Sequence, residues 1–179
     1  MKSLSAATIC TMAVLLAACQ GKEDAGEPAA DTEGGIPTTT TEVEVADLPP
    51  DLLTLVANAV PGIKVDGAER KERDGRVYYD VEGKRADGTE VELDVLKEPT
   101  GYSIVEIQRD IPWSEAPEFV RSAAAASEKA FEPVRVIESK QTDGSVIYEL
   151  FAQGAPEKPS LEVRAVGNKA EVLEEEWMH

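Results

Sequence analysis

Few side chains in this sequence have types and spacing suited to covalent or metal chemistry. The 179 residues contain two cysteines, Cys10 and Cys19, and a single histidine, His179, which is the last residue. Terminal residues are usually frayed. We therefore do not expect His179 to serve a catalytic triad or a zinc site, both of which need a positioned imidazole. Acidic side chains remain, and they number 35.

The carboxylates are numerous enough to form close pairs by chance, as a glycoside hydrolase requires. Most alternate with apolar residues in predicted strands, which indicates a solvated face without the raised pKa of a catalytic acid. Residues 87–90 and 174–176 are rich in oxygen but lack the ligand spacing of a calcium loop. No glycine-rich run precedes Lys-Ser or Lys-Thr, as a phosphate loop requires. The sequence predicts no catalytic residue, no metal ligand and no cofactor, and we expect no enzyme.

The clearest chemical signal surrounds Cys19. A weakly basic start, Met1-Lys2, precedes an apolar run over residues 6–18. This run is too short to span a bilayer, which takes roughly 20 residues, so it is typical of a secretory signal peptide. The small residues Ala17 and Ala18 stand directly before Cys19.

The stretch Leu16-Ala17-Ala18-Cys19 resembles the lipobox of bacterial lipoproteins. The resemblance implies removal of residues 1–18, a covalent lipid on Cys19, and acylation of the new N-terminus by a fatty acid such as palmitate. No thiol then remains for a disulfide or a nucleophile. Gln20, which is not aspartate, implies the outer membrane rather than the inner one, with the protein facing the periplasm.

The sequence is strongly acidic. Its formal net charge is −17, and removal of residues 1–18 takes away Lys2 and leaves −18. Nucleic acid and anionic headgroups repel such a body. We therefore expect no nucleic-acid partner, and contact with the membrane only through the lipid anchor. Residues 19–42 are rich in Gly, Pro, Thr and acidic residues, which predicts a flexible, lipidated tether.

The rest of the chain contains an internal repeat. Asp74-Gly75 and Asp143-Gly144 lie 69 positions apart. Around them, residues 69–71 match 138–140, residues 77–81 match 146–150, and residues 91–95 match 161–165. The match predicts two copies, residues 43–109 and 110–177, that share a buried interface because each is small for a lone domain.

Each copy is predicted to form one helix followed by an antiparallel meander. Pro49-Pro50 begins the first helix and Pro61-Gly62 ends it, whereas Pro117 begins the second and Pro133 ends it. The strands alternate apolar and acidic residues, as in a sheet with one wet face. Asp-Gly pairs at 74–75, 87–88 and 143–144 predict hairpin turns. The predicted fold class is α+β, with two tandem repeats, each one helix packed on a 3–4-stranded antiparallel sheet.

These patterns together resemble the PepSY-like family of small secreted domains, whose related folds bind β-lactamases. The resemblance rests on an acidic-x-Pro helix entry, a Pro-Gly stop and two strand patterns, at residues 47–49, 61–62, 75–81 and 90–95. The second copy keeps the entry and the strands but replaces the stop by Glu132-Pro133. The resemblance implies a non-catalytic α+β module of envelope proteins and protease propeptides that binds or inhibits peptidases.

Several aromatic and proline residues are candidates for contact with a partner. Tryptophan is enriched in interface hot spots, and proline lowers the entropy that a loop loses on ordering. The same residues also suit ordinary packing and a plain hairpin connection. The candidates are Trp113, Tyr102, Phe151, Pro156, Pro159 and Trp177.

The predicted function is non-catalytic binding of an envelope protein, such as a peptidase that the chain inhibits or regulates, from a lipid-anchored position facing the periplasm. The alternative is a structural or sensory lipoprotein that binds divalent cations through its acidic faces. Calcium titration separates the two hypotheses, because only the alternative predicts saturable binding.

Overall fold

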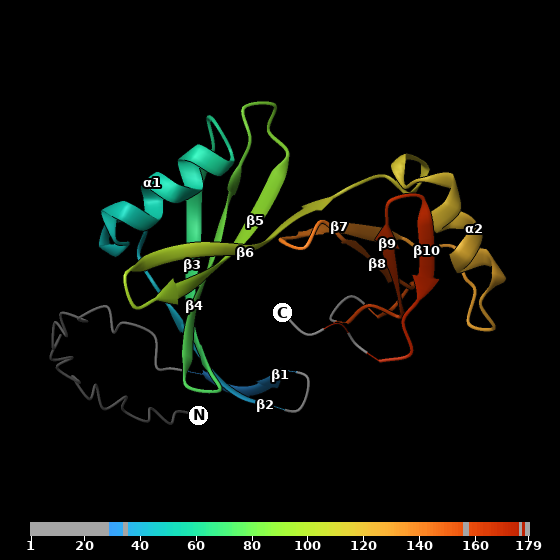
Figure 1. Cartoon of the computed structure of the whole chain (residues 1–179), viewed down its shortest axis with the longest axis horizontal. Coiled ribbons are helices and arrows are strands. Elements are labelled where there is room, and N and C mark those ends of the chain that lie inside the picture. Colours follow the sequence, from blue (N-terminus) through green and yellow to red (C-terminus); the bar gives the residue numbers. More distant parts are fainter. Residues whose placement is uncertain (1–28, 34–35, 156–157, 176, 178–179) are drawn as a thin grey trace, which may run out of the picture.

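The computed structural model describes residues 29–33, 36–155, 158–175 and 177. Its strands form one antiparallel sheet of ten strands that follow one another in chain order (Figure 1). They are β1 (Ala29–Glu33), β2 (Ile36–Glu42), β3 (Lys64–Arg73), β4 (Arg76–Lys84), β5 (Glu90–Glu98), β6 (Gly101–Asp110), β7 (Arg135–Gln141), β8 (Val146–Phe151), β9 (Leu161–Val166) and β10 (Lys169–Val172). The predicted signal peptide, Cys19 and Pro156 lie outside the described residues.

The predicted fold class of two tandem repeats, each one helix packed on a 3–4-stranded antiparallel sheet, is wrong, because the strands form one continuous sheet. β6 pairs with β5 along one edge and with β7 along the other. Residues 106–108 have Cα partners on both sides, in residues 92–94 and 139–141. Both edges of β6 are therefore paired at these residues, and the sheet is not divided between β6 and β7.

Two short α-helices lie over the same face of this sheet. A 3-10 turn (Val45–Asp47) precedes α1 (Pro50–Ala59), and a second one (Trp113–Glu115) precedes α2 (Glu118–Ala126). The predicted proline starts are confirmed, since prolines occupy the entry to both helices. α2 ends before the predicted stop at Pro133, because Ser127 already has extended dihedral angles (φ −69°, ψ 146°).

Each helix covers a separate hydrophobic cluster. Leu52 and Val56 of α1 are buried with Val81, Leu93 and Val95 of the sheet. Val120 and Ala124 of α2 are buried in a second cluster with side chains of β7, β8 and β9. α1 contacts β6, whereas α2 contacts β9 and β10 at the other end of the sheet (Figure 1). Apolar burial is therefore divided between the two ends, although the backbone hydrogen bonding is continuous.

The predicted Asp-Gly hairpin turns are confirmed. Asp74 and Gly75 both have positive φ (50° and 71°) and join Arg73 to its cross-strand partner Arg76. Two successive residues of this kind form the turn whose twist matches that of the flanking strands. Gly88 and Gly144 also have positive φ, at 86° and 82°.

The structure differs from the prediction of a flexible tether that extends to residue 42. β1 and β2 pair with each other, and β2 pairs with β3. Four consecutive threonines, Thr38 to Thr41, lie in β2, and β-branched side chains favour strands. This strand propensity, together with the edge that β3 offers, explains why the segment joins the sheet.

Candidate functional site

The face of the sheet opposite the helices carries a row of acidic residues. Cross-strand pairing places Glu42 opposite Glu69, Glu69 opposite Asp80, Asp80 opposite Asp94, and Asp94 opposite Glu106. The next partner in the row is the neutral Gln141. Like charges that face each other directly across strands are destabilising. Five carboxylates aligned over five strands therefore need compensation by cations or protons.

The centre of this acidic row is buried. Asp80, Asp94 and Glu106 are only 6 %, 7 % and 1 % exposed. The prediction that the acidic face is wet is therefore wrong at its centre. Burial makes the charge problem more severe, because an ionised carboxylate without a partner loses its hydration.

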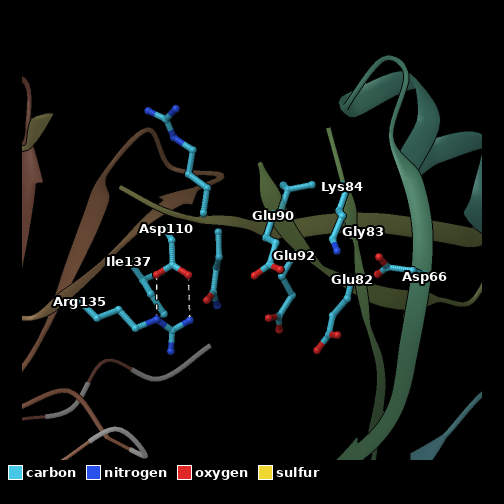
Figure 2. Close-up of a pocket in the computed structure, with 12 residues that line it drawn as sticks. Asp66, Glu82, Gly83, Lys84, Glu90, Glu92, Asp110, Arg135 and Ile137 are labelled. Atoms are coloured by element: carbon cyan, nitrogen blue, oxygen red, sulfur yellow. Dashed lines mark hydrogen bonds and ion pairs between the residues drawn. The ribbon is translucent and has the colours of Figure 1, made fainter. Parts of the chain in front are cut away.

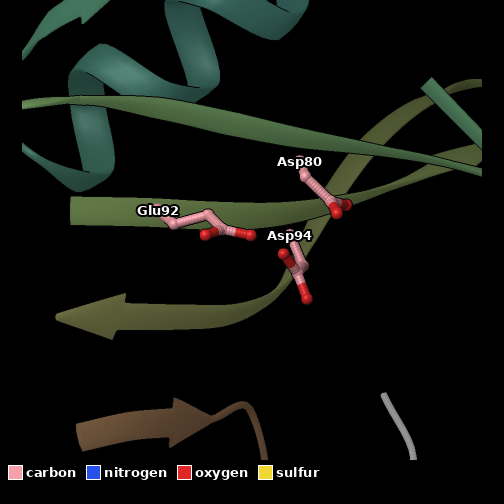
Figure 3. A group of neighbouring side chains, drawn as sticks. All are labelled: Asp80, Glu92 and Asp94. Atoms are coloured by element: carbon pink, nitrogen blue, oxygen red, sulfur yellow. The ribbon is translucent and has the colours of Figure 1, made fainter. Parts of the chain in front are cut away.

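Three of these side chains form a compact carboxylate triad, Asp80, Glu92 and Asp94. One oxygen from each lies within 4.8 Å of those of the other two, and Figure 3 shows the carboxylates pointing toward a common space. Asp80 comes from β4, and the other two alternate along β5 with the buried Leu93 between them. Period-two alternation of the strand thus brings Glu92 and Asp94 to one face.

One carboxylate of the triad lacks a hydrogen-bond partner. No donor among the described residues bonds to Oδ1 of Asp94, although this side chain is buried. Asp80 differs, since the Lys71 ammonium lies 2.5 Å from its Oδ2 atom. Buried polar atoms are nearly always paired, so the free Oδ1 atom within an acidic cluster indicates room for a cation.

Burial also changes the acidity of the triad. Burial, and then the charges of Asp80 and Glu82, raise the pKa of Glu92 to about 7, while Lys71 acts in the opposite direction. Burial likewise raises the pKa of Asp94 well above its usual range, with the charges of Asp80 and Glu92 acting in the same direction. Both causes penalise the ionised form. Without an added cation, protons therefore neutralise part of the triad at neutral pH.

Hydrogen bonds connect the end of the acidic row to the second half of the sheet. The Gln141 Nε2 amide donates to Glu106 Oε1 at 2.7 Å and to Ser139 Oγ at 2.8 Å. Glu106 and Ser139 are both buried. The amide therefore joins a first-half carboxylate on β6 to β7, at the point where the two halves meet.

A cavity of about 250 Å³ opens beside Glu92. Figure 2 shows Glu82, Glu90 and Glu92 on one side of it and the ion pair of Asp110 with Arg135 on the other. The Arg135 guanidinium donates from Nε to Oδ1 of Asp110 at 2.8 Å and from Nη2 to Oδ2 at 3.2 Å. Glu92 therefore belongs to both the cavity and the triad, whereas Asp80 and Asp94 do not line the cavity.

The predicted partner-binding residues do not gather in one place. Tyr102 packs edge-to-face on Tyr79 (centroids 5.9 Å apart, 75° between planes) beside the first cluster, whereas Trp113 packs against the second. Phe151 is buried, with the Arg135 guanidinium 5.2 Å from its ring centroid.

The remaining candidates lie near the end of the chain. Trp177 is half-buried, its ring centroid lies 5.8 Å from Cζ of Arg164, and its backbone N–H donates to Oε2 of Glu162 at 2.7 Å. Pro159 is half-buried. Contact of any of these residues with a partner stays a prediction.

The carboxylate triad was not among the residues singled out from the sequence. Its signal is present in Glu90-Val91-Glu92-Leu93-Asp94, where acidic residues alternate with apolar ones, but the same pattern is typical of any half-exposed strand. The cross-strand register, which places Asp80 opposite Asp94, is what distinguishes a carboxylate cluster from an ordinary half-exposed strand.

Two comparisons, one with protein-family models and one with curated proteins, find no match. Within the described residues, no helix is both long and apolar enough to span a membrane. The PepSY-like resemblance stays a prediction, and the geometry of the site carries the functional argument.

Proposed function

We propose that this chain is a non-catalytic protein of the bacterial cell envelope that binds one divalent cation, Ca²⁺, at Asp80, Glu92 and Asp94. A single observation carries the proposal: the buried Asp94 carboxylate has an oxygen without a hydrogen-bond partner among the described residues, inside a compact group of three carboxylates. Bound Ca²⁺ satisfies that oxygen and removes the repulsion along the acidic row.

The number of carboxylates in the triad supports calcium over magnesium. Calcium–oxygen distances are about 2.3–2.6 Å, so two ligand atoms on opposite sides of the ion are about 4.8 Å apart. The triad oxygens lie within 4.8 Å of one another, so one Ca²⁺ ion can contact all three. Magnesium requires near-ideal octahedral geometry, usually keeps several waters and is held by one or two carboxylates, so a site of three carboxylates favours calcium.

The chemistry of the donors supports the same class of cation. Carboxylate oxygens favour hard cations such as Ca²⁺, Mg²⁺ and Mn²⁺, whereas softer metals favour thiolate or imidazole ligands. Three carboxylates do not complete the six to eight ligands that calcium takes. Water in the cavity beside Glu92 supplies the remaining oxygen ligands in this proposal.

The location in the envelope is part of the proposal and rests on the sequence. The lipobox-like stretch before Cys19 supports a lipid anchor, and Gln20 supports the outer membrane with the protein facing the periplasm. The acidic body supports attachment through the lipid alone, because anionic headgroups repel it.

Isothermal titration calorimetry of the mature chain with Ca²⁺ tests the cation proposal, with Cys19→Ser used to avoid the lipid. We expect saturable binding of one ion in the micromolar range, within the spread of oxygen-ligand calcium sites. Asp94→Asn abolishes it, whereas Asp51→Asn leaves it intact, because Asp51 lies on α1 on the other face of the sheet. Weak, unsaturable binding that salt abolishes in all three proteins contradicts the proposal.

Binding of an envelope protein is the second candidate function. One observation favours it: a groove of about 440 Å³ borders α2, with Trp113 and Phe131 beside the small residues Ala124 and Ala125. In-cell crosslinking of a tagged chain tests it. A dominant peptidase that the purified chain inhibits, and that Trp113→Ala no longer binds, supports this function. The absence of any partner above background contradicts it.

A further inference from the structure

Lys71 occupies a special position at the carboxylate triad. It lies on β3 opposite Tyr78, which precedes Asp80 by two residues, so Lys71 and Asp80 share one face of the sheet. Its ammonium lies 2.5 Å from Oδ2 of Asp80. A covalently tethered cation is therefore already in contact with a carboxylate to which we assign Ca²⁺.

We propose that Lys71 is a specificity-determining residue of this site: its ammonium is a built-in competitor that monovalent cations do not displace and divalent cations overcome. The inference rests on the proposed calcium binding. It goes further, because it assigns the choice between classes of cation to a residue that is not itself a metal ligand.

The charge balance explains why monovalent ions do not displace the ammonium. Replacing one monovalent cation by another leaves the net charge of the site unchanged, so the exchange gains no Coulomb energy. Lys71 also belongs to the same chain as the triad, so its ammonium loses no translational freedom when it binds, whereas a sodium or potassium ion does.

The electrostatic balance is different for a divalent ion. It brings one additional positive charge next to three carboxylates, two of them buried, and Coulomb interactions are stronger in such a partly desolvated place than in water. The same ion is repelled by the neighbouring Lys71 ammonium. Lys71 therefore lowers the affinity for Ca²⁺ but excludes monovalent ions more strongly, and the difference between the two effects is selectivity.

Calcium titrations of Lys71→Met and the parent chain, both with Cys19→Ser, test this inference. Each is measured at equal ionic strength in sodium chloride and in choline chloride, whose bulky cation does not fit the triad. For Lys71→Met in choline chloride we expect calcium affinity to rise roughly five- to tenfold, from the loss of one nearby positive charge. Sodium should then compete with Ca²⁺ in Lys71→Met, whereas the parent chain binds Ca²⁺ equally in both salts.

Two further variants separate this role from general effects. Lys64→Met removes a positive charge from an exposed position on the same strand and should change neither affinity nor salt response. Lys71→Arg keeps the charge and should behave as the parent chain does, and it also serves if Lys71→Met fails to fold.

The outcomes distinguish this inference from the calcium proposal on which it rests. If the parent chain binds Ca²⁺ and Lys71→Met binds it equally or more weakly, Lys71 merely anchors Asp80 and the inference is overturned while calcium binding stands. Binding by Lys71→Met alone shows that Ca²⁺ does not overcome the lysine of the natural site, which overturns both the inference and the calcium proposal. If neither protein binds Ca²⁺, both proposals fail.

Discussion

The two halves of the sheet carry matching sequence segments, but the first half has a buried carboxylate, Asp94, with an oxygen that lacks a hydrogen-bond partner among the described residues. The segment around Asp80 matches the one around Glu149, and the segment with Glu92 and Asp94 matches the one with Glu162 and Arg164. An arginine thus stands in the second half where the first half has the buried Asp94. The second half therefore has a positive charge of its own at the position that matches the buried Asp94.

The surroundings of Arg164 show the consequence. Its Nη2 atom lies 3.4 Å from Oδ2 of Asp143 and its Nη1 atom 3.5 Å from Oε1 of Glu171, while Trp177 lies beneath the guanidinium. A backbone donor from the end of the chain also reaches Glu162. In the second half, groups of the chain itself therefore contact Asp143, Glu171 and Glu162.

The lysines of the two halves differ for another reason, which is register. Lys71 and Lys140 each stand three residues before an Asp-Gly pair, yet Lys71 pairs with Tyr78 whereas Lys140 pairs with Val146, one position short of the matching partner Ile147. A one-residue slip turns a side chain to the opposite face of the sheet. Lys140 accordingly lies on the helix side of the sheet, with its Nζ atom 3.7 Å from Oε2 of Glu138. The length of the hairpin turn therefore determines which face of the sheet carries the lysine.

The largest expected effect comes from making the first half resemble the second. Asp94→Arg places a cation where Arg164 stands in the matching segment, and we expect calcium affinity to fall roughly 100-fold or more, through loss of a ligand and gain of a repelling charge. Calorimetry measures this change. Because arginine is larger than aspartate, Asp94→Asn is the companion variant, and retention of full affinity in both would break the comparison between the halves.

The next effect concerns stability of the cation-free protein as pH changes. The pKa of Glu92 is raised from 4.5 to about 7 by burial and by its acidic neighbours. A carboxyl whose pKa is raised by folding stabilises the protein while protonated, so this contribution is lost as pH rises from about 4.5 to about 7. The groups that act on Glu92 are Asp80, Glu82, Lys71, Glu106 and Arg135.

Denaturant unfolding in the presence of a chelator measures this effect. We expect the free energy of unfolding to fall on the order of 2 kcal/mol between pH 5 and pH 8. Added Ca²⁺ should restore it at pH 8, because a ligand that binds only the folded state stabilises that state. Glu92→Gln should make the slope shallower but not remove it, because the pKa of Asp94 is also raised, whereas Asp51→Asn should leave the slope unchanged. A parallel slope in Glu92→Gln would place the effect elsewhere in the protein.

Much of the local structure was predictable from sequence. The proline entry to α1, the Asp-Gly turns and the strands after Asp74-Gly75 follow from backbone preferences of a few neighbouring residues, and the structure has them where expected. Such preferences do not depend on distant parts of the chain. The same holds for Leu52 and Val56, whose helical spacing places them on one buried face.

The continuous sheet and the candidate site were beyond the reach of these patterns. The sheet is continuous because β6 pairs with β7 along its second edge. The alternation of side chains along β6 does not predict this pairing. Likewise, the sequence predicts that Asp80, Asp94 and Glu106 are solvated. In the structure, strand pairing aligns them and the fold buries them. Both features are long-range, so they depend on pairing between strands and not on the composition of any one strand.

A smaller effect is expected where the two halves meet. Gln141→Leu removes the amide that donates to the buried Glu106 carboxylate and to Ser139. Loss of a donor to a buried charged group costs about 1–3 kcal/mol, so we expect a fall of about 1 kcal/mol or more in the free energy of unfolding, measured in denaturant. Gln153→Leu, in an exposed loop, is the matched control. An equal loss in both variants would show that the bridge contributes nothing specific.

The smallest effect is expected from removing the cation of the second half. Arg164 is partly exposed and its ion pairs are long, at 3.4 and 3.5 Å. Such pairs contribute about 0–1 kcal/mol, and Arg164→Met should therefore lower the free energy of unfolding by less than about 1 kcal/mol, compared with the exposed Arg76→Met.

The number of calcium ions bound by Arg164→Met is more informative than its free energy of unfolding. We expect it to stay at one ion per chain, because Glu162 still accepts the backbone N–H of Trp177 and the matching segment still lacks the carboxylate that Asp94 provides. The further change Arg164→Asp supplies that carboxylate, and a second bound ion in this variant alone would show that one side chain decides which half of the sheet needs a cation. If Arg164→Met already binds a second ion, the difference in cation binding between the two halves is due to the positive charge of Arg164 and not to a missing carboxylate ligand.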